Sequence, residues 1–313
     1  MTHNCAKSSP ELIISNEDIH YFNAIIERPG EEVQFFPSYD NTQLAVTIVH
    51  PQARVKGVVL LIHGLCARAN LYLPLADELA ENGYRIYLLD IRSHGYSHGV
   101  QGHMPSRDAM AQDIRHFYDF VFNLEGSKQH YIAIGHSLGT YVWINFLSTY
   151  EDVAIDALAL ISGGSMHKIG ANTSIKDKMK YLEYINKWQA FLSIFNHNMK
   201  PIHVVFPEIP QLRQSGFIQD YGFSFFSFIR GSAERFEAFY KNTKIPIMMI
   251  YGSEDELFNT ANLEGTYQLI GNENKKLVSL KGKTHTSIIW SSAPYINGWL
   301  EGYFDTIITP HTF

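Results

Sequence analysis

The stretch Tyr131–Leu147, YIAIGHSLGTYVWINFL, places one serine between two glycines where two apolar runs meet. The first run, Tyr131–Ile134, has the composition of a buried strand, and the second favours a helix. Between them, GHSLG at Gly135–Gly139 fits the pattern G-x-S-x-G in the strand–turn–helix context that this pattern requires. We predict a tight turn that strains the backbone of Ser137 and pushes its hydroxyl above a sheet edge. An ordinary turn that contains a serine is the alternative.

The neighbours of this serine suit a nucleophile. A side chain at Gly135 or Gly139 would collide with nearby backbone, so both positions favour glycine. The amide of Leu138 begins the following helix, where outward-pointing N–H groups favour negative charge. The pattern therefore predicts that Ser137 attacks a substrate.

Composition narrows the class of protein. The chain has 313 residues, of which 45% are hydrophobic and 18% charged, so it can bury a sizeable core in one large α/β domain or two ordinary domains. The net charge of −6 argues against broad affinity for nucleic acid. The sequence has no apolar run long enough for a membrane span and no secretory pattern at its start. Its two cysteines cannot build a disulfide framework, so we expect a cytoplasmic protein.

Short β-rich apolar runs alternate with helical patterns, which is typical of a mostly parallel sheet with helices on both faces. The runs are Val58–Ile62, Arg85–Leu89, Tyr131–Ile134, Ala157–Ile161, Ile247–Tyr251 and Lys276–Leu280. Before them, Val33–Phe36 and Leu44–Val49 flank a turn-rich segment and predict an antiparallel hairpin. We divide the chain into an N-terminal extension at 1–31, an α/β core at 32–164 and 241–313, and a cap insertion at 165–240.

Three helices are predicted within the core. One has apolar residues at steps of three and four, namely Met110, Ile114, Phe117, Val121 and Leu124. Leu71–Leu79 and Ala293–Phe304 show similar, weaker patterns.

The predicted insertion interrupts the alternation, with several helical stretches and many aromatic side chains. The densest group is Phe217, Tyr221, Phe223, Phe225, Phe226 and Phe228. Core packing explains such residues well. The alternative is an apolar lid that shields an acyl chain and touches a lipid surface, and both roles can coexist on the two faces of a cap.

A serine hydroxyl needs a base to accept its proton and a carboxylate to orient that base. In this architecture the acid and then the histidine follow the serine along the chain. Asp255 comes directly after the apolar run at Ile247, and Glu254 is its nearest competitor. His285 follows the last short run, so we predict that Asp255 orients His285 as the base. An ordinary solvated charge and a structural histidine are the alternatives.

The loop after Val58–Ile62 is the expected place for a second oxyanion donor. Gly64 there allows the backbone to turn toward the serine, and we predict that the Leu65 amide points at the developing oxyanion. Cys66 is expected to be a packed small side chain. The closely spaced His94, His98 and His103 lie in a loop broken by glycines, which disfavours a metal site.

Three segments resemble the α/β-hydrolase superfamily, and more narrowly its monoacylglycerol lipase and lysophospholipase-like branch. LIHGL at Leu61–Leu65 is similar to its oxyanion loop, the segment Gly83–Ser106 to its D-x-R-G-H-G-x-S-x-G-x-R-G-H block, and GHSLG to its nucleophile elbow. The resemblance covers nearly the whole chain from about Glu32 and is weakest in the insertion.

The resemblance implies a Ser137–Asp255–His285 triad with oxyanion amides on Leu65 and Leu138, a cap, and no cofactor or metal. It also implies hydrolysis of lipid esters of the monoacylglycerol or lysophospholipid type through an acyl-enzyme, with peripheral membrane contact through the cap as a further hypothesis. A small-ester carboxylesterase, a thioesterase and an acyltransferase share this triad. Epoxide and haloalkane hydrolases carry aspartate at the elbow, which Ser137 argues against. A non-catalytic ligand-binding homologue is the alternative outside the enzymes.

Overall fold

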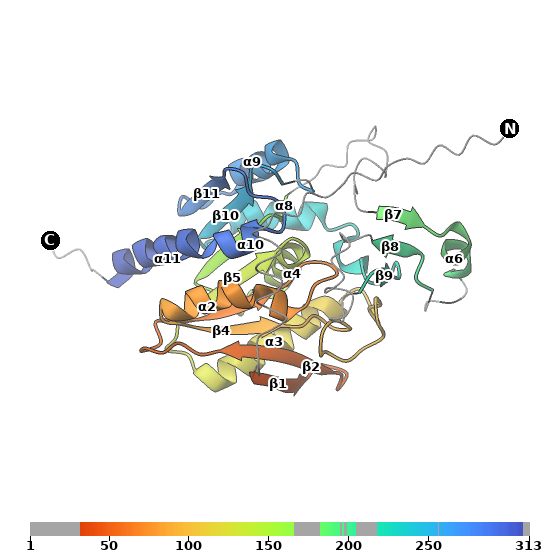
Figure 1. Cartoon of the computed structure of the whole chain (residues 1–313), viewed down its shortest axis with the longest axis horizontal. Helices are drawn as coiled ribbons and strands as arrows, with labels where there is room; N and C mark the ends of the chain where they lie inside the picture. Colours follow the sequence, from red (N-terminus) through yellow and green to blue (C-terminus); the bar gives the residue numbers. More distant parts are fainter. Residues whose placement is uncertain are drawn as a thin grey trace.

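The computed structural model describes residues 32–165, 182–194, 196, 199–204, 218–255 and 257–308. An eight-stranded sheet runs through it in the order β1-β2-β4-β3-β5-β6-β10-β11 (Figure 1). Its strands are β1 (Glu32–Pro37), β2 (Gln43–Val49), β3 (Gly57–Ile62), β4 (Tyr84–Leu89), β5 (Tyr131–His136), β6 (Ala157–Ile161), β10 (Ile247–Gly252) and β11 (Lys275–Leu280). All eight predicted strands are therefore confirmed.

The sheet is antiparallel at one edge and parallel elsewhere. β1 and β2 pair antiparallel, which confirms the predicted hairpin, and β2 pairs antiparallel with β4. All other neighbouring strands of the sheet are parallel. Parallel neighbours require long crossover connections, and these are where the helices lie.

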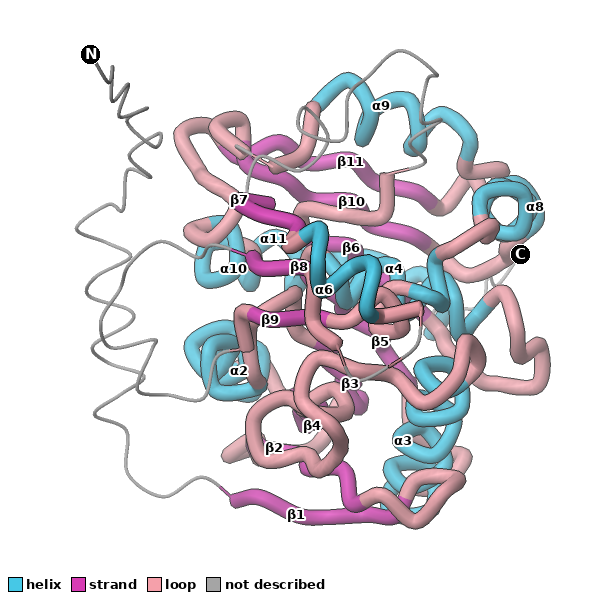
Figure 2. Tube along the Cα trace, turned by 90° about the vertical axis from the view of Figure 1, so that its right-hand side faces the viewer, coloured by secondary structure: helices cyan, strands magenta, loops and turns pink. Residues whose placement is uncertain are grey.

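Helices cover both faces of the sheet, and Figure 2 separates α2 and α10 on one side from α3 and α8 on the other. The first face is covered by α2 (Leu73–Glu81), α10 (Ile288–Ser291) and α11 (Ala293–Ile308), and the second by α3 (Ala109–Glu125), α4 (Leu138–Leu147), α8 (Ala233–Asn242) and α9 (Thr260–Leu269). A short 3₁₀ turn, η1 (Ala69–Tyr72), precedes α2. None of these helices combines the length and apolar character needed to cross a bilayer.

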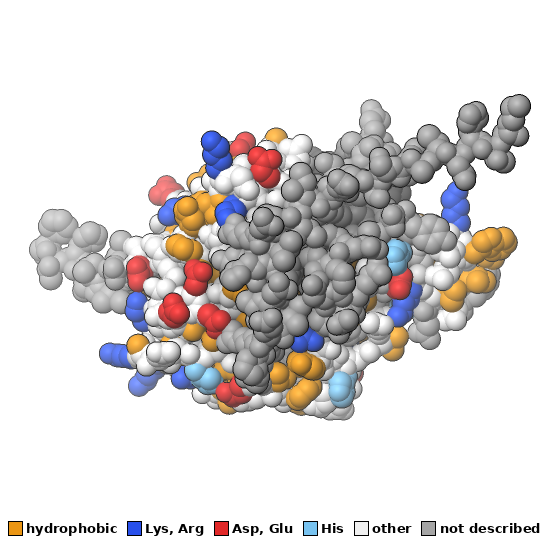
Figure 3. Space-filling model, viewed as in Figure 1, with side chains coloured by type: hydrophobic (Ala, Val, Ile, Leu, Met, Phe, Trp, Pro, Cys, Tyr) orange, Lys and Arg blue, Asp and Glu red, His pale blue; other side chains and the backbone are white. Residues whose placement is uncertain are grey.

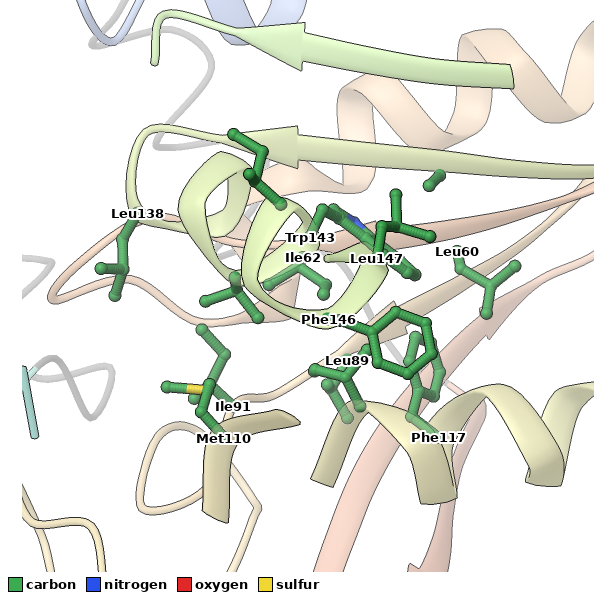
Figure 4. Packing of buried hydrophobic residues seen from close by; sticks show 14 of the residues in the cluster. Leu60, Ile62, Leu89, Ile91, Met110, Phe117, Leu138, Trp143, Phe146 and Leu147 are labelled. Carbon is green, nitrogen blue, oxygen red and sulfur yellow. The ribbon is translucent and has the colours of Figure 1, made fainter. Parts of the chain in front are cut away.

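The central strands supply both layers of the core because successive side chains point to opposite faces. Along β3, Leu60 and Ile62 pack in one layer, while Val59 and Leu61 pack in the other. Figure 4 shows Leu60 and Ile62 against the α4 side chains, including Trp143. Burying one such aliphatic side chain contributes about 1.5–3 kcal/mol, so α4 is held firmly behind Ser137.

The last turn of helix α3 differs from the predicted apolar pattern. Its predicted face is buried from Met110 to Val121, but Leu124 is 54% exposed. The buried position in the last turn belongs instead to Glu125, which pairs with Arg85 and accepts a hydrogen bond from the hydroxyl of Tyr87. Apolar spacing alone does not reveal that a helix end faces a cation and a hydroxyl.

The predicted insertion contains a small antiparallel sheet that the sequence analysis did not predict (Figure 1). The strands of this sheet are β7 (Leu182–Ile185), β8 (Ile202–Val204) and β9 (Asp220–Tyr221). The insertion also contains α6 (Lys187–Leu192) and the 3₁₀ turn η2 (Ser227–Ile229). Strands of two to four residues are too short for a period-two pattern. Helix α8 crosses the predicted boundary at 240/241 and buries Phe236 and Tyr240 in the main core.

The aromatic group of the insertion is divided between core and surface. Tyr221, Phe225 and Phe228 are buried, whereas Phe226 is half-buried and Phe223 is exposed. Core packing therefore accounts for the three buried rings. Phe217, Cys5 and the extension at 1–31 lie outside the described residues.

Candidate active site

The G-x-S-x-G segment joins β5 to α4. Ser137 directly precedes α4 with φ 52° and ψ −115°, in a region that residues other than glycine rarely occupy. Its amide donates a hydrogen bond to the carbonyl oxygen of Ile161 at 2.9 Å, which fastens the turn to β6. The structure thus places a strained backbone at the predicted serine.

The glycines around Ser137 permit close backbone packing. A Cβ on Gly135 would lie 2.6 Å from the carbonyl carbon of Gly139, and one on Gly139 would collide with the carbonyl oxygen of Ile62. A Cβ on Gly64 would approach Cβ of Ser137 to 3.2 Å. The loop after β3 therefore lies directly against the elbow.

The structure pairs His285 with Asp255 and leaves Glu254 exposed. Nδ1 of His285 lies 3.1 Å from Oδ2 of Asp255, whose side chain is fully buried. The other carboxylate oxygen, Oδ1, accepts hydrogen bonds from the amides of Leu257 and Phe258, both at 2.9 Å. The carboxylate is thus held in one orientation toward the imidazole.

Opposing effects set the pKa of Asp255. Burial is the largest single effect and raises it, but the lowering effects together, led by the charge and hydrogen bond of His285, outweigh burial, so the pKa lies below its ordinary value. A carboxyl with a lowered folded-state pKa stabilises the fold above its unfolded pKa, and this stabilisation is lost as pH falls through the folded value. At neutral pH the group is a carboxylate.

His136 connects the elbow to His285. Its Nε2 lies 3.0 Å from the carbonyl oxygen of His285, and the two rings are 4.7 Å apart between centroids. Because His136 precedes Ser137, this contact brings the backbone of His285 beside the elbow. Ser137, Asp255 and His285 come from the loops after β5, β10 and β11. These strands are parallel, so the three loops lie at the same end of the sheet, where the parallel strands end.

Two backbone amides next to the elbow have no hydrogen-bond acceptor in the described part of the chain. They belong to Leu65, in the loop after β3, and to Leu138, at the start of α4. An N–H at a helix start carries part of the positive end of the helix dipole. Both amides are available to a developing negative charge.

Comparison with known proteins identifies the family of this chain. The family model described as serine aminopeptidase, S33, matches residues 53–289, which is most of the chain. The chain belongs to this family. Its resemblance to the α/β-hydrolase superfamily and its predicted fold class are thereby confirmed.

Relatives of this chain agree with the predicted branch. It is 28% identical over 104 residues to a monoacylglycerol lipase of Mycolicibacterium smegmatis and 26% identical over 123 residues to a probable lysophospholipase L2 of Haemophilus influenzae. The matches span 33% and 38% of this chain, and only 37% and 39% of those relatives. A soluble variant of the Saccharomyces cerevisiae monoglyceride lipase shares the fold, with a TM-score of 0.68, 17% identity, and coverage of 89% of this chain and 97% of that one.

The clustered histidines of this chain make separate contacts. The buried ring of His94 lies between the rings of His63 and Tyr221. Nδ1 of His103 lies 3.2 Å from the hydroxyl oxygen of Ser224. The ring of His98 packs on the ring of Phe35. In the described ranges, no three histidine, cysteine or acidic side chains come together as a metal site.

Cys66 is buried, which raises the pKa of its thiol to about 12.

The D-x-R part of the motif block, Asp90–Arg92, makes structural contacts. Arg92 is almost fully buried and donates hydrogen bonds to Asp40 beside β2 and to Asp113 on α3. Asp90 accepts hydrogen bonds from the amides of Ala69 and Tyr96. The block thus ties the hairpin, α3 and the loop after β4 together behind the site.

No sequence pattern predicts a role for Tyr72, and Tyr221 stands out in the sequence only as one of the aromatic side chains of the insertion. Both hydroxyls reach the loop at Gly64–Cys66. No local pattern marks such contacts, because Tyr221 lies 155 residues along the chain from Cys66.

Proposed function

We propose that this chain is a serine hydrolase that cleaves carboxylic esters, of the monoacylglycerol or lysophospholipid type, through an acyl-enzyme. The observation that carries the proposal is the His285–Asp255 pair, which lies beside a strained Ser137 and two amides without acceptors. Family membership and the relatives named monoacylglycerol lipase and lysophospholipase support the ester class.

The proposed first half-reaction uses only side chains and amides of this chain. Oγ of Ser137 bonds to the ester carbonyl carbon while Nε2 of His285 takes the hydroxyl proton. The carbonyl π electrons move to oxygen, and this oxyanion accepts hydrogen bonds from the amides of Leu65 and Leu138. When the oxyanion collapses, the ester C–O bond breaks and His285 returns the proton to the departing alcohol. Acyl-Ser137 remains.

The second half-reaction repeats these steps with water. His285 takes a proton from the water as its oxygen bonds to the acyl carbon, and Ser137 leaves with that proton. Asp255 holds the Nδ1–H tautomer of His285 throughout, which keeps the Nε2 lone pair free to accept a proton, and it stabilises the imidazolium.

Substrate profiling combined with covalent labelling tests the proposed function. We expect a fluorophosphonate probe to label Ser137. We also expect monoacylglycerols or lysophospholipids to be hydrolysed faster than short p-nitrophenyl esters. The p-nitrophenyl esters form a series of rising acyl length. A preference for acetyl and butyryl esters would favour a small-ester carboxylesterase, and thioesters can be assayed alongside. A chain that neither labels nor hydrolyses any ester would instead be a non-catalytic homologue.

A lipid substrate predicts contact between the insertion and a lipid surface. Helix α6 and the turn after it expose four large apolar side chains, with Trp188 77% and Ile194 66% exposed, and hydrophobic side chains gather at this end of the molecule in Figure 3. The four are Trp188, Phe191, Leu192 and Ile194. We call them the α6 surface. Exposed apolar side chains in such a group mark interaction sites.

Co-sedimentation with phosphatidylcholine vesicles checks this contact. We expect the double variant Trp188→Ser/Phe191→Ser to bind vesicles at least about tenfold more weakly, because it removes two aromatic anchors. Leu124→Ser removes an exposed leucine from α3 and should leave binding unchanged. Equal binding by the wild type and the double variant would exclude the α6 surface as the contact.

A further inference from the structure

Two buried tyrosine hydroxyls flank the Leu65 amide. Oη of Tyr72 accepts a hydrogen bond from the amide of Gly64 at 2.8 Å, and Oη of Tyr221 accepts one from the amide of Cys66 at 2.9 Å. Both tyrosines are fully buried. The amides on either side of Leu65 are therefore occupied, while that of Leu65 has no acceptor in the described ranges.

The proton of the Tyr72 hydroxyl has a defined place. Burial lowers the pKa of His136 to about 3, so its ring is neutral and carries one N–H. That proton lies on Nε2, which faces the carbonyl oxygen of His285 at 3.0 Å. Nδ1 of His136 is then an acceptor and takes the Tyr72 O–H at 2.7 Å. One continuous chain of hydrogen bonds joins Gly64 to the backbone of His285.

Tyr221 has an equivalent arrangement from the opposite side. Burial lowers the pKa of His94 to about 4, so its ring is also neutral. Nδ1 of His94 donates to the carbonyl oxygen of Arg92 at 3.1 Å, which leaves Nε2 as an acceptor for the Tyr221 O–H at 3.0 Å. The carbonyl oxygen of Ile218 is a second, more distant acceptor for this hydroxyl at 3.3 Å. With its proton used in this way, the oxygen of Tyr221 is an acceptor for the Cys66 amide.

The loop Gly64–Cys66 is also held by a contact that involves neither tyrosine. Nε2 of His63 accepts the Ile91 amide, so Nδ1 carries the proton and donates it to the carbonyl oxygen of Gly64 at 2.7 Å. Cys66 adopts φ 64°, a conformation that costs a non-glycine residue energy and persists where its surroundings enforce it. The hydroxyl of Tyr221 on the Cys66 amide is one such constraint.

We propose that Tyr72 and Tyr221 are positioning residues that hold the loop Gly64–Cys66 so that the Leu65 amide points at the oxyanion. This inference rests on the proposed function, because it assigns a purpose to the geometry only if an oxyanion forms there. A donor fixed before the reaction stabilises the transition state without further reorganisation. Tyr221 lies on β9 of the insertion. The oxyanion site is therefore complete only when the insertion packs so that Tyr221 contacts the loop Gly64–Cys66.

Kinetics of Tyr72→Phe, Tyr221→Phe and the double variant test the proposal on the ester that the wild type hydrolyses fastest. Each single change is expected to lower kcat about tenfold to a hundredfold with KM nearly unchanged, because the lost interaction acts in the transition state. Both tyrosines act through one N–H, so the double variant should lose no more than the roughly hundred- to thousandfold cost of one oxyanion donor. The affinity for a trifluoromethyl ketone analogue, whose adduct oxygen occupies the same site, should fall in parallel.

Tyr118→Phe is a matched control. Tyr118 is buried on α3, and its hydroxyl accepts the amide of Ala154 at 2.9 Å, so the change removes the same kind of bond elsewhere. It should leave kcat unchanged. An unchanged kcat in Tyr221→Phe, a loss confined to KM, or an equal loss in Tyr118→Phe would overturn the proposal, and Tyr221→Phe decides alone if Tyr72→Phe does not fold. Failure of the wild type to hydrolyse any ester would refute the proposed function instead.

Discussion

Replacing Ser137 with alanine should lower the rate of ester hydrolysis by a factor on the order of 10⁶, because alanine lacks the hydroxyl that forms the acyl bond. The structure places Ser137 at the strained junction of β5 and α4, against the loop of Gly64. Alanine keeps a Cβ there and removes only the hydroxyl, so the turn should persist. The measurement is kcat/KM on the preferred ester, together with labelling by a fluorophosphonate, which should disappear.

A control for this variant needs the same substitution at another strained serine. Ser93 has φ 70° and lies in the loop after β4, where its hydroxyl accepts the amide of Gly102. Ser93→Ala therefore changes a left-handed serine without touching the elbow and should keep turnover within a few fold of wild type. Retention of most activity in Ser137→Ala would mean that another residue carries out the chemistry.

The sequence predicted the parts of this molecule that depend on local patterns. Strand β5, the glycine-flanked Ser137 and helix α4 are adjacent in the chain, so steric rules for one turn are enough to place them. The proximity of Asp255 and His285 followed from the order of loops along a parallel sheet, because such loops meet at one edge. Their assigned roles remain predictions.

The contacts that the sequence did not predict are long-range and polar. Nothing near Glu125 indicates that Arg85 and Tyr87 will take its carboxylate in place of a buried Leu124. The hydroxyls of Tyr72 and Tyr221 reach the loop after β3 only once the sheet and the insertion are assembled. Apolar periodicity reports which face of an element is buried, and it carries no information about the partner of a single hydroxyl.

Asp255→Asn is the second substitution for which we expect a large effect, with kcat lower by about 10⁴. The two amides of Leu257 and Phe258 donate to Oδ1 of Asp255, so the asparagine oxygen should occupy that position. The asparagine NH₂ must then face Nδ1 of His285, at the place where Oδ2 now lies. Two donors cannot pair, so Nδ1 becomes the acceptor and the ring proton moves to Nε2. His285 can then no longer take the proton of Ser137.

Glu254→Gln provides the matched control, since it makes the same carboxylate-to-amide change on the neighbouring exposed residue. It should leave kcat unchanged, because its side chain is not paired with His285. The pH profile separates a tautomer effect from unfolding. Asp255→Asn should regain part of its activity at alkaline pH, because hydroxide replaces His285 as the base there. The thermal unfolding midpoint of the variant should stay constant over the same pH range. A loss of activity shared equally by Glu254→Gln, or a normal rate in Asp255→Asn, would remove Asp255 from the proposed mechanism and leave the orientation of His285 to another group.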